Sequence, residues 1–397
     1  MATSRTLIVA GAGIGGLTAA LALAHRGHRV VVVEQSEKLS DAGAGIQLSP
    51  NATRILATFG VTSRLAPLAV TPEGLSIRRA KTGREIAFIP LGSQMEFRFG
   101  APYWMVHRGD LQSALADAVH HHPDIVLKLA TRLDDLAIHA HGITAQLREG
   151  GSIHDERAIG LIGADGLWSL TREKLGDTSK PRFRNRTAWR AMLPASSVPE
   201  DFRRPAIQLW LGPNAHLVHY PVRGGAFINV VAIVRDRWNQ AGWSAPGQRN
   251  DLLRHFPVSA WARPARDLLQ IPENWHKWAL FDRSGSGYAG RGPMTLLGDA
   301  AHPVLPFLAQ GAAMAIEDAA VLAACLASPA ADLQTGMRRY EALRHGRVLK
   351  IQRAARATGR IYHLSGMRAI ARDVGMQLLG GKRLLARYDW LYDWRPD

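Results

Sequence analysis

The feature that most constrains the fold is a glycine turn between a short apolar run and a helical pattern. The turn reads Gly11-Ala-Gly-Ile-Gly-Gly16, after the apolar run 6–10 and before apolar residues at helical spacing over 15–26. Here the first glycine permits the tight turn, the second lets a pyrophosphate approach the backbone, and the third lets the helix pack on the strand. The helix N-terminus offers N–H donors and partial positive charge to phosphates. The chain is therefore expected to bind a dinucleotide through Gly11, Gly13, Ile14, Gly15 and Gly16.

An acidic residue stands where such a turn requires one. The valine-rich segment 29–34 is typical of a strand buried on both faces of a parallel sheet, and it ends on Glu34. A carboxylate about 20 residues after the glycines hydrogen-bonds ribose hydroxyls, and it repels a 2′-phosphate. The site therefore suits FAD or NAD rather than NADP, and this motif does not decide between the two.

A second cofactor signal lies far along the chain. It runs Leu297-Gly-Asp-Ala-Ala-His-Pro-Val-Leu-Pro-Phe-Leu-Ala-Gln-Gly311 and continues to Glu317-Asp318. A carboxylate, proline turns and a helix start share this segment, and its small residues let backbone N–H groups approach a ring or phosphates. Between the two signals stands Gly163-Ala-Asp-Gly166, after a buried-strand pattern.

Together the three motifs resemble the FAD-dependent aromatic hydroxylases, the group A flavoprotein monooxygenases, in their salicylate hydroxylase, 3-hydroxybenzoate 6-hydroxylase and 6-hydroxynicotinate 3-monooxygenase branch. The resemblance spans roughly residues 5–350. It implies non-covalent FAD, NADH or NADPH as a transient co-substrate, O2, and a small aromatic substrate that a flavin C4a-hydroperoxide hydroxylates. The sequence has no second glycine-rich nucleotide fingerprint, which fits a nicotinamide met transiently at a shared surface.

The resemblance assigns cofactor roles outside the glycine turn. Asp299 is expected to bind the flavin ribitol, and Arg108 matches an arginine that contacts the flavin. Asp165 matches a residue that serves FAD and the nicotinamide, and Arg172 is able to clamp a phosphate. An Asp-Gly turn with a surface arginine is the alternative for this pair. The residues expected to approach the pyrophosphate and the flavin are Gly311, Ala312 and Ala313.

The candidate substrate residues lie in the segment 214–221. In an extended strand alternate side chains share a face, so His216 and Tyr220 lie together and His219 points to the other face. The resemblance places a His and a Tyr at this spacing beside the substrate. It also places Gln310 near the substrate, and a turn with Pro303 and Pro306 beside the flavin where oxygen reacts.

A phenol ring becomes a better nucleophile as its hydroxyl loses its proton. His216 is the candidate base, since a group with a pKa near neutrality suits that step, and a satisfied core histidine is the alternative. Tyr220 and Gln310 would then hold a phenolate or carboxylate. Gln47 is a further cofactor or substrate contact, at the end of the glycine-rich loop 41–47. The 6-hydroxynicotinate enzymes carry a His in that region, which argues against a pyridine substrate.

The predicted fold is α/β: a Rossmann-like FAD-binding domain of the para-hydroxybenzoate hydroxylase type, with an inserted sheet-based substrate domain and a helical C-terminus. Alternating strands and tryptophans concentrate in the second of these parts. The FAD domain is expected over 1–75, 100–180 and 285–350, the substrate domain over 76–99 and 181–284, and the C-terminal helical segment over 351–397. Within them, half-exposed strands are expected over 71–100, and a meander over 125–130, 135–139 and 142–148.

Composition narrows the class further. The net charge is +16, but the basic residues are scattered, so a surface that recruits anionic ligands is favoured over a nucleic-acid site. The single cysteine, Cys325, lies in an apolar helical pattern and fits a reducing cytoplasm. Acidic residues in the longest apolar helix, 312–327, argue against a membrane span. The run 120–122 is three histidines without ligand spacing, so no metal is expected.

Three questions stay open in the sequence. The same fold accommodates a monooxygenase or epoxidase that acts on a larger natural product or lipid. A flavin- or NAD-binding regulatory protein without turnover is the alternative from another class. The aromatic segment Tyr388-Asp-Trp-Leu-Tyr-Asp-Trp394 packs either on its own domain or at a subunit contact, and the chain is expected as a monomer or homodimer.

Overall fold

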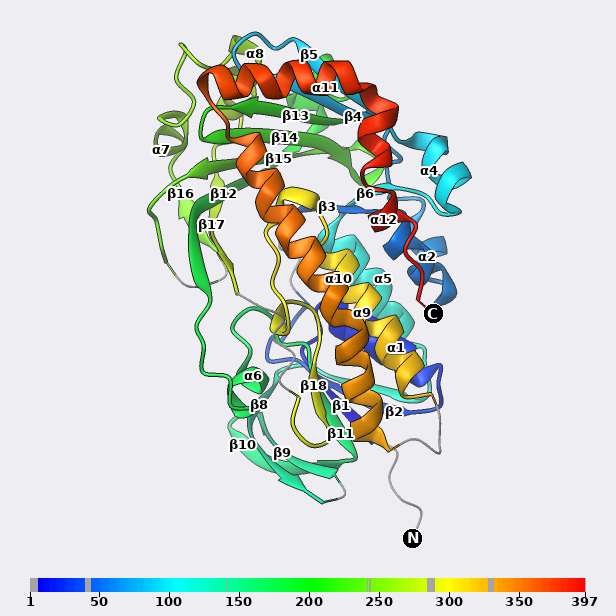
Figure 1. The fold of residues 1–397 in the computed structure, drawn as a ribbon. Coiled ribbons are helices and arrows are strands. Elements are labelled where there is room, and N and C mark those ends of the chain that lie inside the picture. The colour runs from blue at the N-terminus through cyan, green and yellow to red at the C-terminus, as the bar shows by residue number, and fades with distance from the viewer. Residues whose placement is uncertain are drawn as a thin grey trace.

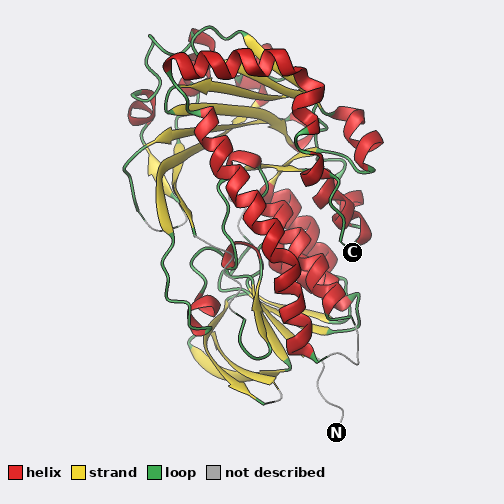
Figure 2. Ribbon diagram, in the orientation of Figure 1, coloured by secondary structure: helices red, strands yellow, loops and turns green. Residues whose placement is uncertain are grey.

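The computed structural model describes residues 6–39, 44–140, 142–240, 242, 244–283, 290–327 and 332–396. A parallel sheet lies toward the N-terminal end of the molecule, a larger mixed sheet lies at the opposite end, and α10 (Leu333–Tyr362) runs between them (Figures 1 and 2). None of the described helices combines the length and the apolar character that a membrane crossing requires.

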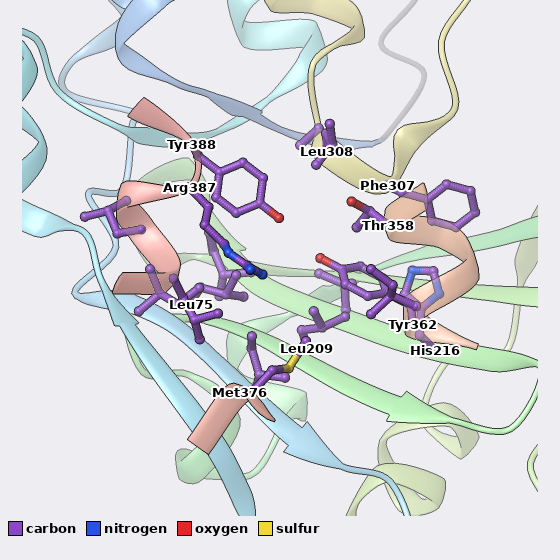
Figure 3. A pocket seen from close by; sticks show the side chains of 18 of the residues that line it. Leu75, Leu209, His216, Phe307, Leu308, Thr358, Tyr362, Met376, Arg387 and Tyr388 are labelled. Carbon is purple, nitrogen blue, oxygen red and sulfur yellow. The ribbon is translucent and has the colours of Figure 1, made fainter. Parts of the chain in front are cut away.

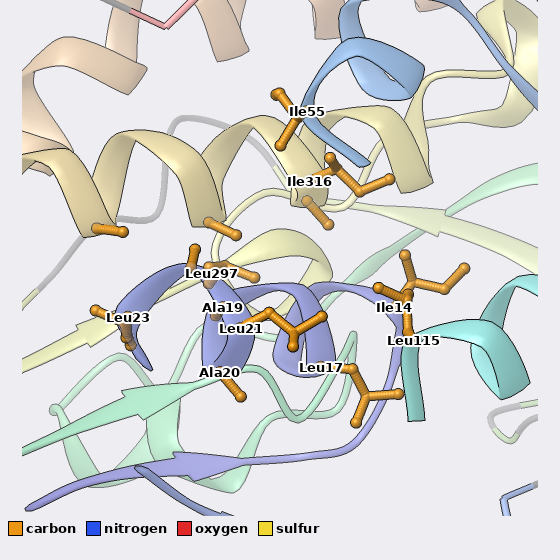
Figure 4. Packing of buried hydrophobic residues seen from close by; sticks show 14 of the residues in the cluster. Ile14, Leu17, Ala19, Ala20, Leu21, Leu23, Ile55, Leu115, Leu297 and Ile316 are labelled. Atoms are coloured by element: carbon orange, nitrogen blue, oxygen red, sulfur yellow. The ribbon is translucent and has the colours of Figure 1, made fainter. Parts of the chain in front are cut away.

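The parallel sheet carries the glycine turn. Its strand order is β18-β11-β1-β2-β7. The strands are β1 (Thr6–Ala10), β2 (Arg29–Val33), β7 (Ile125–Lys128), β11 (Gly160–Gly163) and β18 (Met294–Leu296). Two helices pack on this sheet, α1 (Ile14–Ala24) and α5 (Arg108–His120), and α9 (Gly311–Cys325) packs on α1. Leu17 and Leu21 of α1 meet Leu115 of α5 and Ile316 of α9 in one core (Figure 4). β1 and β2 pair in parallel and α1 connects them, so the strand, helix and strand predicted around the glycine turn are confirmed.

The predicted meander is wrong in its first strand. Residues 125–128 pair in parallel with 30–33 and extend the Rossmann sheet. The chain then turns at Ala130, which has a φ of 50°. The separate antiparallel sheet starts only after that turn, and its strands are β8 (Thr131–His139), β9 (Gly142–Glu149) and β10 (Ser152–Ala158).

The larger sheet has eight strands in the order β16-β17-β12-β15-β14-β13-β4-β5. The strands are β4 (Gly74–Arg79), β5 (Glu85–Pro90), β12 (Arg182–Pro194), β13 (Ile207–Gly212), β14 (Ala215–Val222), β15 (Phe227–Arg235), β16 (Ala245–Gly247) and β17 (Trp275–Asp282). β4 pairs in parallel with β13, so the two segments predicted for the substrate domain share a sheet. The domain boundaries themselves stay a prediction.

The strands expected over 71–100 end early. Gly92 has a φ of 40°, which leaves the extended conformation, and a helix follows as α4 (Gly92–Phe99). That helix ends at Gly100, which has a φ of 73°. The shorter elements are β3 (Gly45–Leu48), β6 (Trp104–His107), α2 (Pro50–Thr58), α3 (Val61–Leu65), α6 (Leu170–Lys174), α7 (Arg249–Leu253) and α8 (Arg263–Gln270).

The C-terminus is helical, as predicted. After α10, α11 (Gly366–Ala386) passes across the larger sheet near β5, and α12 (Asp389–Tyr392) returns toward α2 (Figure 1). Arg54 of α2 donates a hydrogen bond of 2.8 Å to the carbonyl of Trp394. The aromatic C-terminal segment therefore packs on its own chain, and a role at a subunit contact stays a prediction.

Candidate functional site

A cavity of about 390 Å³ separates the glycine turn from the larger sheet. We call it the fingerprint cavity, since the starts of α1 and α9, the turn after β18 and strands β14 and β15 line it. Eleven of the predicted site residues meet there: Gly13, Ile14, Gly15, Gln47, Arg108, His216, Tyr220, Asp299, Pro306, Gly311 and Ala312.

The other glycines of the turn shape it without lining the cavity. Gly11 has a φ of 106°, and a Cβ there would lie 2.6 Å from the Ala164 carbonyl oxygen. A Cβ on Gly16 would lie 1.9 Å from the Gly11 carbonyl oxygen. These two positions thus take on the turn-forming and helix-packing roles expected from the spacing.

The donor groups around the fingerprint cavity fit a dinucleotide such as FAD. Two helices begin at its wall, α1 after Gly13, which has no side chain, and α9 after Gln310, whose side chain does not bond to the helix. The first-turn N–H groups of both helices thus carry partial positive charge and have no side-chain acceptor at the cap. A pyrophosphate supplies the missing acceptors.

Glu34 lies beside the turn rather than on the cavity wall. Its Oε2 accepts the Ala12 N–H at 2.9 Å, and its Oε1 accepts the Ser36 N–H at 3.0 Å. The carboxylate therefore stabilises the backbone of the glycine turn. Its contact with a ribose stays a prediction. Residues 40–43, which begin the glycine-rich loop, lie outside the described residues.

The backbone just before Asp299 is fixed by a buried hydrogen bond on the side away from the cavity. The preceding Gly298 donates its N–H to Asp318 at 2.9 Å. Asp318 also contacts His302 at 2.5 Å and accepts from Arg344 at 2.6 Å. Burial alone would raise the pKa of Asp318, but His302 and Arg344 outweigh it and hold the pKa at about 2. Asp318 is therefore a charged anchor of the second motif.

The Asp299 carboxyl itself lines the fingerprint cavity and is exposed to it. Desolvation raises its pKa, and electrostatic interactions with His302 and Arg108 oppose that rise. Arg108 shows the converse effect, since desolvation lowers its pKa and Asp299 raises it. The two groups are thus electrically coupled across the space predicted for the flavin and its ribitol.

The 163–166 motif and the helix after it contact the second cofactor motif through Arg172. Asp165 accepts from the Ser169 hydroxyl at 2.6 Å and the Thr171 N–H at 2.9 Å, and burial raises its pKa. Arg172 is buried, and it donates to the carbonyls of Ala300 and Ala301. Arg172 is therefore not the surface arginine of the alternative interpretation. Its guanidinium also differs from that of the expected phosphate clamp, because it already donates hydrogen bonds to protein carbonyls.

Gln310, Pro303 and Ala313 are further predicted residues that do not line the fingerprint cavity. Gln310 is buried, where it donates to the Ser49 hydroxyl at 3.0 Å and accepts from Asn51 at 3.1 Å. Pro303 is buried with its carbonyl bonded to Gln352, and Ala313 lies in the core. A side chain at a helix start can turn either way, and these contacts turn Gln310 away from the expected substrate position.

The strand alternation predicted over 214–221 is present in β14. His216 and Tyr220 line the fingerprint cavity, whereas His219 lies on the other face and accepts from Trp210 Nε1 at 3.2 Å. Burial raises the pKa of Tyr220, opposed by Arg190 and by a hydrogen bond with Gln47. Gln47 also accepts from the Tyr103 hydroxyl at 2.7 Å.

His216 differs from the expected base. Its Nδ1 lies 2.7 Å from Nε2 of His363, which caps the C-terminus of α10. Burial, with a smaller contribution from Arg186, lowers the pKa of His216 to about 3. At neutral pH the ring is therefore uncharged, and its pKa is not the near-neutral value expected for a general base.

Arg190 is a functional candidate that the sequence reasoning missed. It lies on β12, lines the fingerprint cavity, and has its guanidinium 5.2 Å from the Trp278 ring centroid. Its Nε is buried without a hydrogen-bond partner, and no described residue forms an ion pair with it. Desolvation lowers its pKa. The sequence feature that could have identified Arg190 is its position as the one cation within the mostly apolar strand segment 187–193.

A second cavity of about 420 Å³ adjoins the first (Figure 3). We call it the sheet cavity, since β4, β5 and β13 line one side and α10 and α11 the other. Most of its lining side chains are aliphatic or aromatic, and Tyr362 and His216 lie close together at one end (Figure 3). The residues that line both cavities are Gln47, His216, Val218, Pro306 and Ala309.

Comparison with known proteins agrees with this geometry. Residues 4–355 match the family model described as FAD binding domain. The chain is 36% identical to 3-hydroxybenzoate 6-hydroxylase of Klebsiella oxytoca over 100% of its length and 98% of that protein. It is 37% identical to 3-amino-4-hydroxybenzoate 2-monooxygenase PtnB3 of Streptomyces platensis, covering 97% and 95%. The structure of Klebsiella pneumoniae HpxO complexed with FAD and uric acid superposes with a TM-score of 0.84 at 25% identity, covering 96% and 95%.

Proposed function

The chain belongs to the FAD-dependent aromatic monooxygenase family, and from that premise we propose that it hydroxylates a small aromatic carboxylic acid with a ring hydroxyl. The two relatives named above act, by their names, on a hydroxybenzoate and an aminohydroxybenzoate. Because those relatives are enzymes over the full length of the match, the alternative of a regulatory protein without turnover is set aside. Location in the cytoplasm, and a monomer or homodimer, stay predictions.

The observation that carries the proposal is the unpaired Arg190 in the fingerprint cavity. A partly buried guanidinium without a carboxylate is costly, and a bound anion removes that cost. Arg190 shares the cavity wall with His216 and Tyr220, which supply further polar groups. A ring that bears a carboxylate and a hydroxyl matches one cation and two neutral polar side chains.

The protein's part in the reaction is binding, orientation and exclusion of water. When bound, FAD supplies hydride acceptance from NADH or NADPH and transfer of an oxygen atom from O2. The helix starts at Gly13 and Gly311 would hold the pyrophosphate, and Asp299 the ribitol. Arg190 would orient the substrate carboxylate, while the aliphatic side chains around the junction of the cavities keep water out.

The test is NADH and NADPH consumption by the FAD-loaded protein with salicylate, 3- and 4-hydroxybenzoate, 6-hydroxynicotinate and urate, with each product identified by mass. We expect stimulation by a benzoate and a product one oxygen heavier, or a catechol where the carboxylate leaves. Stimulation that survives replacement of the carboxylate by a carboxamide would contradict the role of Arg190. Absence of turnover with every benzoate would contradict the substrate class.

A second candidate is a larger, mostly apolar substrate. It is favoured by the sheet cavity, whose lining is aliphatic and aromatic and which joins the fingerprint cavity beside His216. A molecule longer than a single ring would extend into that space. Turnover of a ring acid that rises when an alkyl chain is attached to the ring would select this candidate over a small benzoate.

A further inference from the structure

A chain of three side chains ends at the cavity face of His216. Arg186 of β12 has its Nε 2.9 Å from Nδ1 of His363, and Nε2 of His363 lies 2.7 Å from Nδ1 of His216. His216 and His363 are both buried. The His216 ring lines both cavities, and no described residue forms a hydrogen bond with its Nε2.

The protonation pattern along this chain follows from one fixed donor. A guanidinium is always protonated, so Arg186 Nε donates and Nδ1 of His363 must accept. A neutral imidazole with an acceptor Nδ1 carries its proton on Nε2, so His363 donates to His216. Nδ1 of His216 is then an acceptor in turn. The proton of His216 is therefore on Nε2, the nitrogen without a protein partner.

The surroundings keep both rings neutral. Arg235 on β15 pairs in register with Arg186, Arg372 of α11 lies near His363, and the Tyr362 ring lies against His216. No carboxylate is among the described groups that shift either imidazole. Burial, His216, Arg186 and Arg372 lower the pKa of His363 to about 2, and burial with a contribution from Arg186 lowers the pKa of His216 to about 3.

We propose that His363, held by Arg186, is a positioning residue that fixes His216 as the Nε2–H tautomer, so that His216 donates a hydrogen bond to an anionic oxygen of the substrate. The identity of that acceptor, a carboxylate or phenolate on an aromatic ring, rests on the proposed function. His216 does not take the substrate's proton, because its free ring nitrogen already carries one. The site therefore selects the ionised form of its ligand.

The first test reads the tautomer directly in the FAD-loaded enzyme without substrate. Ring-15N-histidine NMR assigns the His216 signals by their loss in His216→Gln. We expect a protonated Nε2 and an unprotonated Nδ1 between about pH 6 and pH 9. A protonated Nδ1, or an imidazolium at neutral pH, would overturn the proposal. Because this readout needs no turnover, failure of every benzoate as a substrate would leave it interpretable.

The second test uses two variants of His363. In His363→Gln the amide can still accept from Arg186 and donate to His216, whereas His363→Leu can do neither. We expect His363→Leu to mix the two His216 tautomers and to raise KM for an ionised substrate about tenfold, the loss of one charge-assisted hydrogen bond. His363→Gln should keep the wild-type tautomer and KM. Equal behaviour of the two variants would contradict the role.

A matched pair of arginines covers the case in which His363→Leu loses FAD. Arg186 and Arg235 face each other across β12 and β15, but only Arg186 has a hydrogen bond to His363. We expect Arg186→Leu to alter the His216 tautomer and KM, while Arg235→Leu leaves both unchanged. Equal effects, or no effect of Arg186→Leu on the tautomer, would overturn the proposal.

Discussion

Two clusters of buried polar side chains differ in how they handle charge. The carboxylate network lies under the second motif, where Asp318 contacts His302 and Arg344. The buried histidines of the larger sheet and its cover, which we call the histidine cluster, are His216 and His363 on one face of the sheet and His219 on the other. The pKa of Asp318 is lowered to about 2, and the pKa values of the three histidines are lowered to between about 2 and about 3.

The same direction of shift has opposite consequences in the two clusters. A lowered pKa keeps an aspartate charged, because cations stabilise its anion, whereas it keeps a histidine neutral, because burial penalises its cation. The carboxylate network thus uses paired charge to hold the Gly298 backbone in place. The histidine cluster presents a neutral ring to the cavities, where a ligand can bring its own charge.

The largest difference between the two clusters is expected at Asp318. Changing Asp318 to Asn should lower the free energy of unfolding by about 3–5 kcal/mol, since it removes one carboxylate from the buried Arg344 and His302. Urea unfolding at pH 7 measures it. Asp267→Asn is the control, because the pair of Asp267 with Arg263 is exposed and contributes only about 0.3–0.5 kcal/mol. Similar losses for both variants would show that the network does not stabilise the fold.

Substitution of Arg190 tests whether the fingerprint cavity binds the carboxylate of its substrate. Arg190→Met should weaken binding of an aromatic acid about 100-fold, which corresponds to about 2.7 kcal/mol. The substrate-free protein should be no less stable, since a partly buried charge without an ion-pair partner is removed. Titration of substrate and urea unfolding measure the two effects. Lys277→Met is the control, because Lys277 lies over Trp189 and Trp238 and does not line either cavity. Loss of stability without loss of affinity would contradict this role.

The histidine cluster predicts an acid-sensitive fold. His219 binds no proton until its pKa of about 3, whereas an unfolded histidine binds one below about pH 6.5. Stability should therefore be complete above pH 6.5 and decline as the pH falls toward 3. In His219→Gln that decline should be about 1.4 kcal/mol smaller per pH unit, measured by urea unfolding between about pH 6 and pH 4.

The control for this slope is Trp210→Phe. It removes the hydrogen bond to His219 but leaves the imidazole buried, so we expect a lower stability with an unchanged pH dependence. If stability falls with pH in His219→Gln as steeply as in the wild type, groups other than His219 cause the acid sensitivity. The carboxylate network should contribute to acid unfolding only below about pH 4, as Asp318 becomes protonated on the way to its pKa of about 2.

The smallest expected effect concerns the C-terminal segment. The Trp394 ring lies 5.1 Å from the Arg344 guanidinium and 4.7 Å from that of Arg347, so it covers the carboxylate network. Trp394→Leu should cost about 1 kcal/mol of unfolding free energy through the lost cation–π contacts. Trp168→Leu is the control, since that ring is partly exposed and contacts only Phe281 among the described aromatic rings. Equal losses of unfolding free energy in the two variants would show that Trp394 does not stabilise the carboxylate network.

Local patterns predicted much of this molecule from the sequence. The glycine turn, the valine strand and the alternation that pairs His216 with Tyr220 all appear where the spacing indicates. These features depend on backbone geometry over a few residues, which the sequence states directly. The assignments that missed, such as residues 125–128 in a meander, required knowledge of which distant strand pairs with which.

By itself the sequence determined a Rossmann unit, a second cofactor motif and a strand with one His and one Tyr facing the same way. Only the tertiary structure decided that Gln310 turns into the protein, that Arg190 enters the cavity unpaired, and that His363 bonds to His216 from 147 positions away. The reason is physical. Periodicity fixes which face a side chain takes, but its rotamer, charge and proton position depend on desolvation and on partners that distant segments bring.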